Sequence, residues 1–324
     1  MHRLCLLALS LLALSLFAAT SLVGNTVAAQ PERSGPRTFA PGVITTIEPE
    51  ILSEETYSRK PMIEITANQA LDWDPATIAK TRTLYSQAKQ TTFTNEVWGL
   101  EFSFKPLRMV TVEVPNAQGE SERKLLWYLV YNVRNTGERL KAVEKELGEF
   151  TAEPAEPKPV RFLPHFVLEG QDRDTNGQKI YKAYLDRIIP GVVETIRQRE
   201  VPGRELLNNA EMAATPIEVS TEAEDHTVWG VAIWEQVDPE MDFLSIYVSG
   251  LTNAYVWADP EGEYQAGDPA GKGRRIAAKT LQLNFWRPGD EFLENEKEIR
   301  FGVPDGKADL YGVDEGVAYQ WTFR

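Results

Sequence analysis

Residues 172–177 of this chain read DRDTNG, the spacing that opens a calcium-binding loop. Ca²⁺ prefers oxygen ligands, and such a loop supplies them from side chains at alternate positions, followed by a glycine bend. Here these side chains are Asp172, Asp174 and Asn176. The twelfth position of such a loop should be glutamate, but it is Ala183 here. The same residue types are typical of a polar hairpin turn. We therefore predict a turn, keep these three residues as the candidate calcium site, and predict no other metal and no cofactor.

The chain has few histidines that could act in catalysis or bind a metal. Only His165 and His226 follow residue 29, and no G-x-S-x-G motif appears that would place a nucleophilic serine on a sharp turn. The two histidines do not have the sequence spacing of a zinc site. Because Phe162 and Phe166 flank it, we expect His165 to be a packed, hydrogen-bonded core residue.

Paired carboxylates could hydrolyse a glycosidic bond. The chain has 48 acidic residues, so acidic pairs arise by chance and single out no active site. We interpret Glu144, Glu146 and Glu149 as a solvated helix face. A carboxylate-dependent hydrolase stays an alternative hypothesis.

Aromatic residues near predicted loops offer a different chemistry. Trp286 shares strand parity with polar Gln282 and Asn284, and Tyr255 and Trp257 follow a strand near a loop. Exposed aromatic rings on a β-sandwich can stack on sugars, as in carbohydrate-binding modules. Burial in the core is the more common position of tryptophan. A carbohydrate-binding module is therefore an alternative hypothesis, which we place ahead of the hydrolase.

The first 29 residues resemble a secretory signal. Arg3 precedes an uncharged apolar run, and small residues end at Ala29. Removal of this segment takes away Arg3 and no acid, so 33 basic and 48 acidic residues remain, a net charge of −15. We expect an exported, periplasmic or extracellular protein with no stable membrane span after cleavage; retention of the segment as an anchor is the alternative. Such negative charge argues against nucleic-acid partners.

Residues 124–137 read KLLWYLVYNVRNTG and predict the central strand of the fold. Both alternating faces are apolar up to Asn132, which indicates a strand covered on both sides. The cluster Asn135-Thr136-Gly137 is a turn signal, and Trp127 is expected to anchor the core. A buried helix is the competing interpretation of such a run.

The remaining pattern predicts about ten short strands and a few short helices. Residues 97–104 predict a half-buried strand, and 138–147 predict an amphipathic helix. Residues 151–159 read TAEPAEPKP and predict a Pro/Glu spacer. Residues 227–235 and 243–249 predict two strands of one hairpin.

The order of these signals resembles the immunoglobulin-like domains of bacterial envelope proteins that carry an Asn-Thr-Gly turn after the second strand. It also resembles an uncharacterised family of secreted bacterial proteins that share the Trp-Tyr-Leu-Val-Tyr strand. The matching pieces lie between residues 97 and 251. The resemblance implies an accessory or interaction module and carries over no catalytic residues.

The sequence thus predicts a mainly β protein, an immunoglobulin-like antiparallel sandwich with short helical insertions and extra C-terminal strands. We divide it into a signal peptide (1–29), a flexible segment (30–60), the sandwich (61–257) and a loop with additional strands (258–324). The leading hypothesis is an exported, non-enzymatic envelope or extracellular module that binds an envelope protein or a polysaccharide.

Overall fold

The computed structural model describes residues 44–59, 92–115, 120–146, 149–258, 272–288 and 298–324, together with 260, 262, 263 and 268. The predicted signal segment (1–29) lies outside these residues, as do residues 30–43 and 60 of the predicted segment 30–60. Within them the chain is mainly β, as predicted. Every ladder between the described strands is antiparallel.

The first sheet is organised around β7 (Ser121–Arg134), the predicted central strand. Residues 126–133 of this strand are all buried, so the prediction of a strand covered on both faces is confirmed. One edge of β7 pairs with β5 and β6 and the other pairs with β14. The chain turns after β7 at Gly137, whose φ of 79° is one that a glycine adopts without strain. The flanking strands of this sheet are β1 (Thr45–Ile47), β5 (Glu101–Phe104), β6 (Arg108–Pro115) and β14 (Val228–Glu235).

The second sheet is organised around β17 (Arg275–Trp286). Strands from the predicted sandwich and from the predicted C-terminal region 258–324 pair with one another in this sheet, and the C-terminal strand β19 ends one residue before the chain does. Its other strands are β11 (His165–Gly170), β12 (Ala183–Leu185), β15 (Phe243–Ser249), β16 (Tyr255–Ala258), β18 (Arg300–Phe301) and β19 (Tyr319–Phe323).

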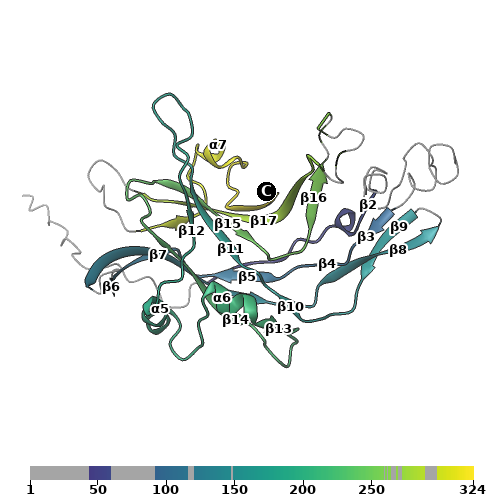
Figure 1. The fold of residues 1–324 in the computed structure, drawn as a ribbon, viewed down its shortest axis with the longest axis horizontal. Coiled ribbons are helices and arrows are strands. Elements are labelled where there is room, and N and C mark those ends of the chain that lie inside the picture. The colour runs from purple at the N-terminus through teal and green to yellow at the C-terminus, as the bar shows by residue number, and fades with distance from the viewer. Residues whose placement is uncertain are drawn as a thin grey trace, which may run out of the picture. The chain divides into compact units, whose positions relative to one another are not determined.

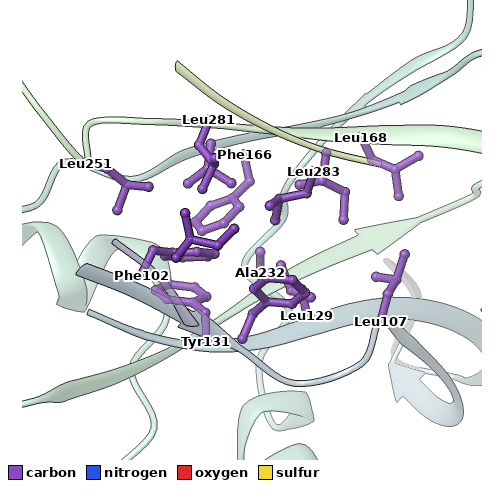
Figure 2. Close-up of a cluster of buried hydrophobic side chains, with 14 of the residues drawn as sticks. Phe102, Leu107, Leu129, Tyr131, Phe166, Leu168, Ala232, Leu251, Leu281 and Leu283 are labelled. Atoms are coloured by element: carbon purple, nitrogen blue, oxygen red, sulfur yellow. The ribbon is translucent and has the colours of Figure 1, made fainter. Parts of the chain in front are cut away.

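The main hydrophobic core lies between the two sheets. Figure 2 shows side chains of the first sheet, among them Phe102 and Tyr131, facing Phe166 and Leu283 of the second. The rings of Tyr131 and Phe166 have centroids 4.8 Å apart. Two antiparallel sheets that bury facing apolar side chains in this way form a β-sandwich.

A second core covers the opposite face of the first sheet. Leu126, Tyr128 and Val130 of β7 pack there with residues of and around α5 (Val192–Glu200), among them Val192 and Ile196. Figure 1 shows α5 beside the β7 end of this sheet, away from β15 and β17. This helical cover explains why residues 126–131 of β7 are apolar on both parities.

Smaller elements complete the described structure. The short helices are η1 (Ser53–Thr56), α6 (Asn209–Ala214) and α7 (Ala308–Tyr311). Three further small sheets pair β2 (Tyr57–Arg59) with β3 (Thr92–Thr94), β10 (Val160–Arg161) with β13 (Pro216–Ile217), and β8 (Arg139–Glu146) with both β4 (Val97–Trp98) and β9 (Glu149–Pro154).

The helix predicted for residues 138–147 is wrong, because β8 occupies that segment. Its Glu- and Lys-rich sequence suits a helix, but β8 pairs along most of its length with β9. Lys145 of β8 and Glu153 of β9 form an ion pair across this hairpin. The first part of the predicted Pro/Glu spacer is therefore a strand, and cross-strand contacts override the local helix preference.

The hairpin predicted from residues 227–235 and 243–249 is also wrong. Both segments are strands, but β14 pairs with β7 in the first sheet, and β15 lies between β11 and β17 in the second. The connection between them buries Val237 and Met241 in the main core. The chain thus crosses from one layer of the sandwich to the other instead of reversing within one layer.

The single strand predicted for residues 97–104 is divided into β4 and β5 by Gly99 and Leu100. The inward face is as predicted, because Phe102 and Phe104 are buried in the main core. On the other parity Ser103 and Lys105 are buried as well, so the strand is more than half-buried.

Candidate functional site

A groove of about 580 Å³ lies between an N-terminal wall and a C-terminal wall of the described structure. Residues of η1, β2 and β3 line one side, and residues of β16 and β19 line the other. We call this hollow the aromatic groove. Its volume is within the range that is common for small-molecule sites.

Five aromatic side chains line the aromatic groove: Tyr57, Phe93, Tyr255, Trp257 and Phe323. Four of them are between 36% and 44% exposed, and Trp257 is partly buried. Part of each ring remains open to solvent and to a ligand, and it is the grouping of the rings in one hollow that is informative. The groove therefore presents an aromatic surface assembled from separate segments.

The rings are held in place by contacts outside the groove. Tyr57 stacks on Phe150 of β9, with ring centroids 6.0 Å apart. The guanidinium of Arg274 lies 4.2 Å from the ring centroid of Trp257, which is cation–π geometry. Tyr57 and Trp257 thus each have a partner that limits the rotation of the ring.

A buried ion pair fixes the N-terminal wall to the second sheet. Lys279 of β17 is almost fully buried, and its Nζ lies 2.6 Å from Oε1 of Glu55 and 2.9 Å from Oε1 of Glu50. It also donates to the carbonyl of Glu50 at 2.9 Å. The second carboxylate oxygen of Glu55 accepts the N–H of Leu52 at 3.0 Å. Both oxygens of Glu55 are therefore used in holding η1 in place.

The polar side chains of the groove are few. Thr94 and Asn95 supply hydrogen-bonding groups, and the N–H of Asn95 donates to the carbonyl of Thr56 at 2.7 Å. Among the described residues that line the groove, the only charged ones are Glu54 and Glu55. A mainly aromatic surface with a few hydrogen-bonding groups is suited to a ligand with alternating apolar and polar faces.

The sequence had singled out only part of this site. The structure brings Tyr255 and Trp257 into the groove, but it places Trp286 at the end of β17 away from β16, where Arg300 lies over its ring. Tyr57, Phe93 and Phe323 were missed, because their segments are far apart in the chain.

The candidate calcium residues lie in a hairpin turn. Oδ1 of Asp174 accepts the N–H groups of Gln178 at 2.8 Å and Asn176 at 2.9 Å, and these bonds hold the pKa of Asp174 below its ordinary value. Gly177 has a φ of 77°, as a tight turn requires. The carboxylate of Asp172 turns away from this turn, toward the start of β15. The two aspartates therefore accept hydrogen bonds from different parts of the backbone.

Asp172 is the more buried of the two aspartates. Burial raises its pKa, although its Oδ1 accepts the N–H of Phe243 at 3.1 Å. Asn176 is exposed at the tip of the turn. Within the described ranges no three Asp, Glu, His or Cys side chains gather as a metal site would require.

The two histidines lie in unrelated surroundings. His165, at the start of β11, is exposed, so the expectation of a packed core histidine is wrong. Strand alternation explains the error, because Phe166 and Leu168 take the inward parity. The ring of His226, in the loop before β14, lies 3.5 Å from the exposed carboxylate of Glu224.

The predicted acidic face at Glu144, Glu146 and Glu149 is solvated, although it lies on strands instead of a helix. The buried carboxylates that sequence reasoning missed are structural. The main example is Glu200 at the end of α5, which accepts from the Tyr128 hydroxyl and from Arg108, both at 2.7 Å.

Lys105 lies 3.3 Å from the other carboxylate oxygen of Glu200. Burial alone would raise the pKa of Glu200, but the Tyr128 hydrogen bond and the two cations hold it below its ordinary value. This cluster ties α5 to the first sheet. The only sequence signal for it was a pair of basic residues, Lys105 and Arg108, beside an apolar strand.

No protein-family model, curated protein or solved structure matches this chain. The immunoglobulin-like family resemblance therefore stays a prediction. In the part of the chain that the structure describes, helices are too short or too polar to cross a membrane.

Proposed function

We propose that this chain is an exported, non-enzymatic binding module and that its aromatic groove binds a polysaccharide chain. The observation that supports this most strongly is the convergence of five partly open aromatic rings from separate segments on one hollow. The apolar faces of sugar rings stack on aromatic side chains, while their hydroxyl groups need hydrogen-bonding partners such as Thr94 and Asn95. Export rests on the signal-like residues 1–29.

The state of the groove carboxylates supports binding over hydrolysis. Glycosidases use two carboxyl groups, one on each side of the scissile bond. Glu55 is committed to Lys279 and to the backbone of Leu52, so it is not free to transfer a proton or attack a sugar. Glu54 is then the one available carboxylate among the described lining residues, and one is too few for either hydrolytic mechanism.

Native gels cast with soluble polysaccharides test the proposal, because a bound glycan retards the protein. The panel holds a neutral β-glucan, a galactomannan, a soluble chitin derivative and an acidic pectate. We expect retardation by at least one glycan and its loss in Trp257→Ala and Tyr255→Ala.

Trp286→Ala is the matched control, because Trp286 also lies beneath an arginine but is outside the groove. Its retardation should equal that of the wild type. A panel in which no glycan retards the wild-type protein would refute the proposal, as would equal loss in the Trp286→Ala control.

A further inference from the structure

The described residues that line the aromatic groove carry charge of one sign. Among its described lining residues there are two glutamates and no lysine or arginine. The pairing around Lys279 does not cancel this charge, because Lys279 is one cation between the carboxylates of Glu50 and Glu55. Arg274 lies over Trp257 outside the lining. The described part of the groove is therefore acidic, as is the chain, which carries a net charge of −14.

Glu54 is the groove carboxylate for which the described residues provide no partner. It is exposed on η1, and it forms neither an ion pair nor a side-chain hydrogen bond with any described residue. Glu55, the next residue, is buried and fully engaged. An unpaired carboxylate beside aromatic rings is complementary to a cationic group carried on a ring-shaped ligand.

We propose that the aromatic groove prefers polysaccharides whose sugars carry free amino groups, with Glu54 accepting a hydrogen bond from a protonated amine while the aromatic rings stack on the sugars. This inference rests on the proposed polysaccharide-binding function and adds the chemistry of the ligand. Acidic glycans are disfavoured by the same charge, because a carboxylate in the groove would meet Glu54.

A pair of hexasaccharides that differ only in charge tests the preference. The fully deacetylated glucosamine hexamer carries free amines, and the N-acetylglucosamine hexamer has the same backbone but no charge. Binding is measured by tryptophan fluorescence in mildly acidic buffer of low ionic strength. We expect the amine form to bind about two- to fivefold more tightly, which is the range of a solvent-exposed ion pair. High salt should remove the difference.

Glu54→Gln should equalise the two hexamers and leave the affinity for the acetylated form unchanged. Glu222→Gln is the matched control, because it removes the same charge from an exposed position in the loop before β14 and should keep the preference. Thermal melts of both variants confirm that they fold.

The outcomes separate this inference from the function on which it rests. If the wild-type protein binds both hexamers equally, or if Glu54→Gln keeps the preference, the amine inference is wrong and polysaccharide binding stands. If no glycan of the panel and neither hexamer binds, the proposed function itself fails. If an oligolysine peptide binds as tightly as the amine hexamer and Trp257→Ala abolishes that binding, the ligand is a cationic peptide and the sugar assignment is overturned.

Discussion

Replacement of Lys279 by methionine should destabilise the protein strongly. The Nζ of Lys279 is buried and lies 2.6 Å from Glu55, whose side chain is only 5% exposed. Methionine has a similar length but no charge, so Glu55 would stay buried without a cation. Loss of one partner of a buried ion pair costs about 3–5 kcal/mol of unfolding free energy. For a domain of this size that corresponds to a fall in Tm of about 6–20 °C.

The effect should depend on the unpaired charge and not on the lost side chain. The double variant Lys279→Met/Glu55→Gln removes both charges and should recover most of the stability, which a double-mutant cycle in urea would measure. Lys145→Met is the matched control, because the ion pair of Lys145 with Glu153 is exposed and solvent screening leaves it little effect on stability. Lys279→Met should also weaken glycan binding, since Lys279 fixes η1 to β17. A Lys279→Met protein that unfolds at the wild-type urea concentration would refute the role assigned to this ion pair.

Three further predictions address the core, the acid response and the turn. Trp127→Ala should cost about 3–5 kcal/mol in urea unfolding, because Trp127 is buried in the main core, and a wild-type midpoint would contradict that position. The pKa of Glu200 is lowered in the folded state, so its contribution is present above the unfolded pKa of about 4.3 and is lost as pH falls through the folded value. The stability difference between wild type and Glu200→Gln should therefore shrink in acid, and a difference that is constant with pH would exclude this linkage. Millimolar calcium should leave the Tm unchanged, since Asp172 and Asp174 bind separate backbone groups, and a rise in Tm that Asp174→Ala abolishes would restore the calcium site.

The central strand could be predicted from sequence because its signal is local. The run from Leu126 to Tyr131 is apolar on both parities, and the Asn135-Thr136-Gly137 turn lies shortly after it. The local pattern also predicts the strands at residues 227–235 and 243–249. It does not predict which strands they pair with, because the pairing depends on the buried connection through Val237 and Met241 and no local pattern encodes the partner.

At residues 138–147 the local pattern predicts the wrong type of element, a helix in place of a strand. Glutamate and lysine favour a helix locally, but β9 follows immediately and pairs with this segment, so cross-strand contacts decide the structure. The aromatic groove could not be predicted from the sequence either, because it too depends on contacts between distant segments. Tyr57 and Phe93 meet Tyr255 only after the chain has folded, and the buried Lys279–Glu55 pair that positions them joins elements from opposite ends of the described chain.

The central claim is that the aromatic groove binds a polysaccharide. The most direct test is a calorimetric titration of two proteins with the glycan that binds best in the gel panel. The wild-type protein should give a saturable binding heat, and the folded double variant Tyr255→Ala/Trp257→Ala should give none. Equal heats from the two proteins would contradict the assignment of the groove.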